Sequence, residues 1–110
     1  MAHYDGYLSG RITSDLKNYK KRFAKWHAFV LANYEVVNLF NPAKTKLKKE
    51  FPAWEDYLAI DIPIICACSI IFMMPLWWIS KGARFEHYNA KKLKKRIIYL
   101  KNKQLTKYWK

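Results

Sequence analysis

The sequence predicts an all-α membrane protein with one transmembrane helix, flanked by an amphipathic N-terminal helix and a basic amphipathic C-terminal helix. The first observation is a run of nineteen residues, Ile62 to Ser80, with the sequence IPIICACSIIFMMPLWWIS and no Lys, Arg, His, Asp or Glu. The second is that aromatic residues stand at both ends of this run. The third is that apolar residues recur at three- and four-residue steps in the segments on either side.

The uncharged run has the length of a membrane span. Nineteen helical residues cover roughly 28 Å, close to the approximately 30 Å hydrocarbon core of a bilayer. With Tyr57 to Ile60 as an interfacial turn, we expect a transmembrane helix over residues 57–80, anchored at the interfaces by Trp54, Tyr57, Trp77 and Trp78. The alternative, a buried central helix of a soluble domain, needs other apolar elements around it, and the remaining segments are only amphipathic.

The pattern divides the chain into five segments. We expect a polar lead over 1–13, an amphipathic helix over 14–41, a charged connector over 42–56, the transmembrane helix over 57–80 and a basic amphipathic helix over 81–110. Ser14 is the expected N-cap of the first helix, with Asp15 favourable in its first turn. Asn41-Pro42 ends that helix, and Pro52 prevents a helix from running through the connector.

The charge is concentrated after the uncharged run. The 110 residues contain 21 Lys and Arg against 8 Asp and Glu, and eleven of the basic residues lie in Lys81 to Lys110, where Glu86 is the single acid. The positive-inside bias favours a C-terminus on the matrix or cytoplasmic side. We expect this tail to contact anionic lipid headgroups or a partner protein, and rank a solvated face and RNA binding below that. The expected contacts are Lys81, Arg84, Lys91, Lys92, Lys94, Lys95 and Arg96.

No residue pattern indicates catalysis, and we expect neither a metal nor a cofactor. On a helix, Cys66 and Cys68 point roughly 200° apart, so they cannot share a metal. Together with Ala67 and Ser69 they are small enough to pack against a neighbouring membrane helix. Asp61 stands at the start of the run, where we expect it to reach the interface or cap the helix rather than carry protons.

The order of an amphipathic helix, an aromatic-flanked span and a Lys-, Tyr- and His-rich tail resembles the small single-pass accessory subunits of mitochondrial inner-membrane energy complexes. The stretch ISKGARFEHYNAKKLKKR is loosely similar to the tail of the ATP synthase f subunit. The resemblance implies a non-catalytic structural subunit, above all in the proton-translocating ATP synthase membrane sector. Such a subunit supports assembly and packing and binds a lipid such as cardiolipin.

Two alternatives remain open. One is an accessory subunit of respiratory complex I, III or IV, and the other is a membrane-tethered basic module that binds RNA or an anionic partner. For the favoured reading, the resemblance implies a single-pass protein of the mitochondrial inner membrane, with its C-terminus on the matrix side and other membrane subunits as partners. Nucleic acid is not an expected partner in that reading.

Overall fold

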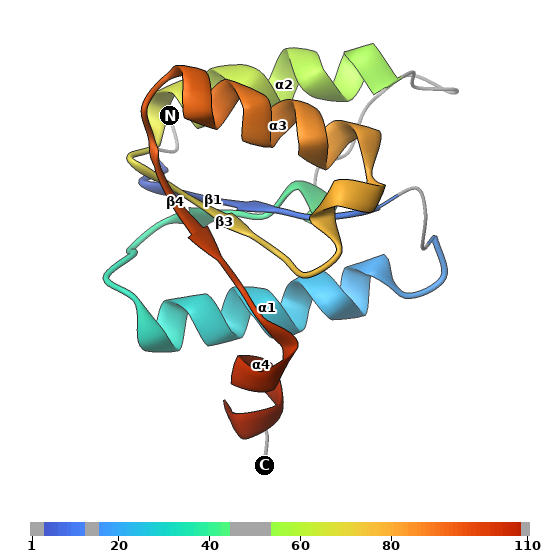
Figure 1. Cartoon of the computed structure of the whole chain (residues 1–110), viewed down its shortest axis with the longest axis vertical. Helices are drawn as coiled ribbons and strands as arrows, with labels where there is room; N and C mark the ends of the chain where they lie inside the picture. The colour runs from blue at the N-terminus through green and yellow to red at the C-terminus, as the bar shows by residue number, and fades with distance from the viewer. Residues whose placement is uncertain (1–3, 13–15, 45–53, 109–110) are drawn as a thin grey trace.

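The computed structural model describes residues 4–12, 16–44 and 54–108, and within them it contains a four-stranded parallel β-sheet with helices on both faces (Figure 1). The strands are β1 (Gly6–Ser9), β2 (Leu39–Phe40), β3 (Ile70–Met73) and β4 (Arg96–Tyr99). Their order in the sheet is β2-β1-β3-β4, and each neighbouring pair is parallel. The protein is therefore an α/β protein.

Helices cover the sheet as two layers. On one side lies α1 (Tyr19–Asn33), against which α4 (Asn102–Tyr108) packs, and on the other side lie α2 (Trp54–Ala67) and α3 (Lys81–Lys92) (Figure 1). Two short 3₁₀ helices, η2 (Pro42–Lys44) and η3 (Trp77–Ile79), join strands to helices. Parallel neighbours need such long crossover connections, which place the helices on the faces of the sheet.

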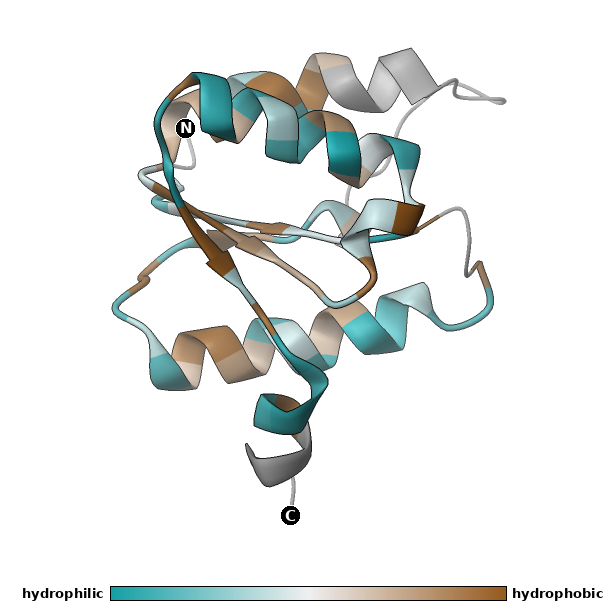
Figure 2. Ribbon diagram, in the orientation of Figure 1, coloured by the Kyte–Doolittle hydropathy of each residue, from teal (hydrophilic) through white to brown (hydrophobic). Residues whose placement is uncertain are grey.

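The sheet has a separate hydrophobic core on each face, because successive strand residues point to opposite sides. On the α1 side, Leu8 and Phe72 pack with Phe23, Trp26 and Val30. The core on the other side consists of Tyr7, Phe40, Ile65, Cys68, Ile71, Met73, Ala83 and Ala90. Figure 2 shows apolar residues on the strands and many hydrophilic residues along α3.

The predicted transmembrane helix is wrong. Residues 57–80 form most of α2, then β3, then η3. In the part of the chain that the structure describes, no helix combines the length and the apolar character needed to cross a membrane. The all-α fold class is corrected to α/β, and the predicted single-pass location in the mitochondrial inner membrane, with its C-terminus on the matrix side, is contradicted together with the span.

The burial of β3 on both faces explains the error. All four of its residues are buried, and a parallel strand covered by helices on both sides reads as a continuous apolar run rather than an alternating one. The apolar end of α2 directly precedes it, so two elements together imitate one span. After β3, Pro75 cannot continue the ladder, and Leu76 adopts a left-handed conformation with φ 65° that turns the chain into η3.

The two predicted flanking helices are also shorter than expected. Within residues 14–41, α1 covers Tyr19–Asn33 and the chain then returns to the sheet as β2. The predicted cap at Ser14 and Asp15 lies outside the described residues. Within residues 81–110, α3 ends near Leu93, a turn with Lys94 at φ 57° follows, and the next residues form β4 and α4. Pairing with β3 has overridden the helical spacing of this segment.

Replacing Phe72 by Ala tests the position of β3. Phe72 is fully buried, and its ring lies 5.0 Å from that of Tyr34, so the substitution leaves a cavity in the core. We expect the free energy of unfolding, measured by urea denaturation, to fall by about 3–5 kcal/mol. Val37, which is 83% exposed, is the control, and Val37→Ala should stay within about 0.5 kcal/mol of the parent. Equal effects of the two substitutions would contradict the core position of Phe72.

Candidate functional site

The most unusual group in the protein is the carboxyl of Glu86, which is only 5% exposed. The Tyr7 hydroxyl donates a hydrogen bond to Glu86 Oε2. The Ser9 hydroxyl donates a second one to Glu86 Oε1, with an oxygen–oxygen distance of 2.6 Å. Both oxygens of one buried carboxyl group are therefore held by hydroxyls of the same strand.

Local structure brings these three side chains together. Tyr7 and Ser9 are two residues apart in β1, so both point to the face covered by α2 and α3. The start of α3 is set by Ser80, whose hydroxyl accepts a hydrogen bond from the Ala83 amide at 3.2 Å. Glu86 follows Ala83 by three residues, so it lies on the buried side of the helix, against the sheet.

Asp61 of α2 completes the group. It is 5% exposed and, in addition to burial, its charge raises the pKa values of Tyr7 and Glu86, so its carboxyl lies beside these two groups. Its Oδ1 atom is buried and has no hydrogen-bond partner among the described residues. We call Tyr7, Ser9, Asp61 and Glu86 the acid site. The sequence-based expectation that Asp61 reaches an interface or caps a helix is wrong, since it lies in the interior of α2 and faces the sheet.

Burial raises the pKa of both carboxyl groups in the acid site. Burial and then the charge of Asp61 raise the pKa of Glu86 to about 8, although the hydrogen bonds from Ser9 and Tyr7 lower it. Burial raises the pKa of Asp61 to about 6, against opposing hydrogen bonds with Tyr7 and Glu86. Burial also raises the pKa of Tyr7 well above its ordinary value, so the phenol stays a donor. The pair of Asp61 and Glu86 thus favours sharing one proton near neutral pH.

The acid site also has a characteristic place in the topology. Strand order reverses between β1 and β3, because β2 lies outside β1 and β4 lies outside β3. In open parallel sheets, ligands bind at the carboxyl ends of the strands at such a reversal. Ser9 is the last residue of β1, and the Met74 amide donates to its carbonyl at 2.8 Å, so the acid site lies next to this point.

A cleft of about 380 Å³ lies at the β2 edge of the sheet, and none of the four acid-site residues lines it. Its lining includes Tyr4, His27 and Phe40. The Phe40 ring stacks on the Tyr7 ring at a centroid distance of 5.3 Å. One aromatic ring therefore contacts both the cleft and the phenol that holds Glu86.

The basic residues predicted to contact lipid or a partner all belong to one stretch of α3, the following turn and β4. The side chain of Lys95 donates from Nζ to the Cys66 carbonyl at 2.8 Å, at the C-terminal end of α2, where a cation is favourable. Lys95 is half-buried. The others are exposed: Lys81, Arg84, Lys91 and Lys92 on α3, Lys94 in the turn and Arg96 in β4.

The predicted aromatic anchors do not flank a membrane span. Trp77 and Trp78 form η3, and the Trp77 ring packs on the His87 ring at a centroid distance of 4.2 Å. Trp54 and Tyr57 belong to the first part of α2, and their side chains lie outside the described part of the chain.

The predicted packing residues make contacts within the chain. Cys68 is buried with its Sγ 3.6 Å from the Tyr4 carbonyl, and burial raises the pKa of its thiol to about 11. The Ser69 hydroxyl donates to the Asp5 carbonyl at 3.2 Å. Cys66 and Ala67, at the end of α2, are exposed. Cys68 and Ser69 therefore join the loop before β3 to the start of β1.

Sequence reasoning missed Tyr7, Ser9 and Glu86. The hydrogen bond between Tyr7 and Glu86 joins residues 79 positions apart, and no short motif records such a contact. One signal was present, since Glu86 is the single acid among the last thirty residues. In the sequence analysis, this lone acid counts only toward the net charge of a strongly basic segment.

Comparison with known proteins places the chain in a family. Residues 4–99 match the family described as domain of unknown function (DUF4406). The chain belongs to this family. The match spans all four residues of the acid site. No curated protein and no solved structure matches the chain, and nothing in these comparisons connects it to ATP synthase or to the respiratory chain.

The raised pKa of Glu86 predicts that this family member loses stability as pH rises. When folding raises the pKa of an acid, the acid contributes its full stabilisation at pH values below its pKa in the unfolded chain. That contribution is lost as the pH rises from the pKa of the unfolded chain to the pKa of the folded protein. For Glu86 this loss of stability occurs between pH 4.5 and about pH 8. Asp61 also lowers stability, between pH 3.8 and about pH 6. We expect the free energy of unfolding in urea to fall by on the order of a few kcal/mol between pH 5 and pH 8.5.

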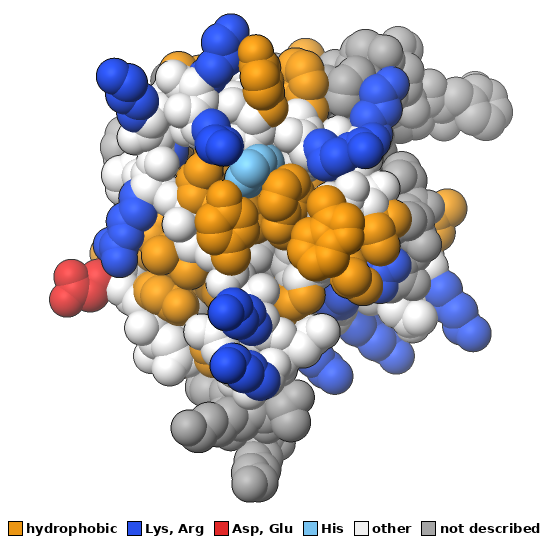
Figure 3. Space-filling view, viewed as in Figure 1, with side chains coloured by type: hydrophobic (Ala, Val, Ile, Leu, Met, Phe, Trp, Pro, Cys, Tyr) orange, Lys and Arg blue, Asp and Glu red, His pale blue; other side chains and the backbone are white. Residues whose placement is uncertain are grey.

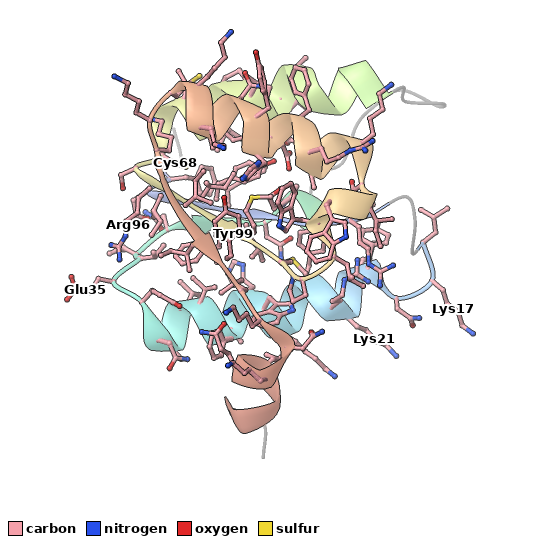
Figure 4. The ribbon with its side chains drawn as sticks, in the orientation of Figure 1. Lys17, Lys21, Glu35, Cys68, Arg96 and Tyr99 are labelled. Carbon is pink, nitrogen blue, oxygen red and sulfur yellow. The ribbon has the colours of Figure 1, made fainter. Side chains whose placement is uncertain are left out.

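Two variants separate this effect from other titrating groups. Glu86→Gln removes the titrating carboxyl and should flatten most of the decline. Glu35→Gln changes an exposed acid in the loop after α1, which Figure 4 shows pointing away from the protein, and should keep the parent profile. A Glu86→Gln profile as steep as the parent's would contradict the assignment.

Proposed function

We propose that this chain is an enzyme that cleaves glycosidic bonds or transfers the glycosyl group to an acceptor, with Glu86 as its reactive carboxyl group. The observation that carries the proposal is the buried pair of Asp61 and Glu86, which favours sharing one proton and is bound by two hydroxyls of β1. Two carboxyls with separated pKa values supply an acid and a base in one place, the usual arrangement for acid–base catalysis near neutral pH.

Breaking a glycosidic bond requires both properties of the pair. The leaving atom must receive a proton, and the positive charge that develops at the anomeric carbon must meet a carboxylate. In most glycosidases two carboxyls about 5 Å or more apart flank the bond. Asp61 and Glu86 instead shift each other's pKa, so they would share one proton as a single unit.

In the first step, the pair gives its proton to the leaving atom. The bond between this atom and the anomeric carbon breaks, and a Glu86 oxygen bonds to that carbon to form a glycosyl ester. Asp61 remains as a carboxylate. The shared proton would pass to the leaving atom from Asp61 Oδ1, which has no partner among the described residues, so Glu86 is the carboxylate when it bonds to the anomeric carbon.

In the second step, water or another acceptor attacks the anomeric carbon. The acceptor's proton goes to Asp61, the ester bond breaks, and the one-proton pair is restored. Tyr7 and Ser9 keep their hydroxyls on the Glu86 oxygens, where they orient the carboxylate and stabilise it whenever it is charged. They are positioning residues for the carboxyl that reacts.

This proposal departs from the expectation that the chain is not catalytic by itself. That expectation rested on the absence of a local sequence motif, whereas the acid site is assembled from three elements distant in the chain. The expected accessory-subunit role in an energy-transducing complex stays a prediction, although the membrane span from which it was argued is contradicted.

The test is release of the leaving group from a panel of glycosides. The panel contains 4-nitrophenyl O-glycosides and nucleosides, which carry an N-glycosidic bond, and release is followed by absorbance and chromatography. We expect turnover of at least one class, a loss of about a thousandfold or more for Glu86→Gln, and a smaller loss for Tyr7→Phe. For the substrate that turns over, a slow 2-fluoro analogue should add the mass of one glycosyl group to the intact protein.

Controls separate catalysis from folding. Glu35→Gln should keep full activity, because that acid is exposed and remote from the acid site. Glu86→Ala should regain turnover with added azide or formate, because a small anion can take the place of the missing carboxylate. A folded protein that cleaves no member of either class, or a Glu86→Gln variant as active as the parent, would refute the proposal.

A further inference from the structure

A second group of side chains lies outside the acid site, on the outer surface formed by η3, α3 and β4. We call Trp77, Trp78, His87 and Tyr99 the aromatic cluster. The Trp77 ring lies 4.2 Å from the His87 ring and 6.2 Å from the Tyr99 ring, with interplanar angles of 33° and 34°. The Trp78 ring lies 6.0 Å from Trp77. Rings from three elements thus form one contiguous surface.

The aromatic cluster is partly exposed and includes a hydrogen bond between two of its members. Trp78 is 54% exposed and Tyr99 is 49% exposed, although large aromatic side chains normally bury most of their area. His87 Nε2 and the Tyr99 hydroxyl lie 2.7 Å apart in a hydrogen bond that joins α3 to β4. Figure 3 shows hydrophobic side chains gathered around a histidine on this face, and Figure 4 places Tyr99 on the strand beneath α3.

Positive charges surround the aromatic cluster. Arg84 and Lys91 lie three residues before and four residues after His87, so they are its neighbours on the helix surface. Burial and then the charge of Lys91 lower the pKa of His87. Lys101 follows Tyr99 by two residues. In Figure 3, blue side chains stand around the hydrophobic patch, and the red one lies at the edge of the view.

We propose that the aromatic cluster and its basic border bind single-stranded nucleic acid. Exposed rings stack on unpaired bases of any sequence, and Lys and Arg beside them attract the phosphates. The surface combines both requirements, and a formal net charge of +13 attracts a polyanion over a longer range. A duplex fits less well, because its bases stack on each other and are not available to the rings.

Two other occupants fit the surface less well. A second copy docked through the same face would bring Arg84 and Lys91 of each copy near those of the other, and like charges across an interface are unfavourable. An anionic lipid surface would attract the lysines. The cluster, however, consists of aromatic rings, two of which are joined by the His87–Tyr99 hydrogen bond, and not of aliphatic side chains that could insert between lipid tails. Both occupants are outcomes of the test below.

This inference departs from the expectation that nucleic acid is not a partner. That expectation treated the basic segment as the flank of a membrane span, and the described residues contain no such span. The inference also stands apart from the proposed glycosidic chemistry, since the aromatic cluster lies on the outer side of α3 and the Glu86 carboxyl on its inner side.

The experiment measures fluorescence anisotropy of fluorescein-labelled oligo(dT) and oligo(rU) of about 15 nucleotides, the upper range for one small binding domain. We expect saturable binding of both, and weaker binding of a labelled duplex of equal length. Trp78→Ala should weaken single-strand binding about tenfold with an unchanged salt dependence, because it removes a stacking ring and no charge. Lys91→Ala should reduce the slope of log affinity against log salt by about 0.7.

Matched controls identify the surface. Val37→Ala removes an exposed hydrophobic side chain next to β2, the opposite edge strand of the sheet. Lys21→Ala removes an exposed lysine of α1, which Figure 4 shows pointing outward on the other side of the sheet. Both should bind as the parent does, and so should Glu86→Gln, since binding does not depend on the acid site. All variants are first confirmed by urea denaturation to be folded at the pH of the binding assay.

Four results would overturn the proposal. Trp78→Ala binding the oligonucleotides as tightly as the parent would show that charge alone is responsible. Equal affinity for the duplex would exclude base stacking. Binding to phosphatidylglycerol vesicles without binding to either oligonucleotide would assign the surface to lipid. A dimer in sedimentation that Trp78→Ala dissociates, again without oligonucleotide binding, would assign it to a second copy of the chain.

Discussion

Every other feature of this protein depends on a parallel sheet that must be covered on both faces. Each crossover between parallel strands is long enough to contain a helix, and those helices fill the space above and below the sheet. The register pairs β1 with β3 from Gly6 with Ile70 to Ser9 with Met73, and β3 with β4 from Ile70 with Arg96 to Met73 with Tyr99. Because this register sets which residues face each layer, it determines both cores and the acid site.

The acid site shows what the layer of α2 and α3 accomplishes beyond covering the sheet. A buried carboxyl is unfavourable unless it is hydrogen-bonded or neutralised, and Glu86 is both. Ala83 and Ala90, on the same buried side of α3, are small enough to let the helix lie close to the strands. Glu86 is therefore within reach of the Tyr7 and Ser9 hydroxyls. Burial raises the pKa of its carboxyl group, which favours the uncharged form over a buried charge without a partner.

One helix supports both proposed activities because of its geometry. Glu86 and His87 are consecutive residues, and a turn of about 100° per residue directs them to different sides of α3. Glu86 faces the sheet, whereas His87 joins Trp77 and Tyr99 on the outer surface. A change that rotates or shifts α3, such as the loss of the Ser80 cap, therefore affects the acid site and the aromatic cluster together.

The amphipathic pattern before residue 34 was interpretable from the sequence, because helical spacing is a local property. Phe23, Trp26 and Val30, which predicted the first helix, are buried in α1. The basic character of the segment after Ser80 was equally plain. The sequence also showed that residues 62–80 carry no charge, but not whether the surroundings of this run are lipid or protein, since both produce the same uncharged run.

The tertiary structure decided the rest. Pairing with β1 and β4 converts Ile70–Met73 into a strand, although the neighbouring residues suggest one continuous helix. The acid site depends on the same pairing, because Tyr7, Asp61 and Glu86 come from three elements and meet only when the sheet has formed. A local pattern reports what each residue prefers. Which distant residues become neighbours is decided by how the layers pack, and that is the physical reason why the fold class and the acid site could not be predicted from the sequence pattern.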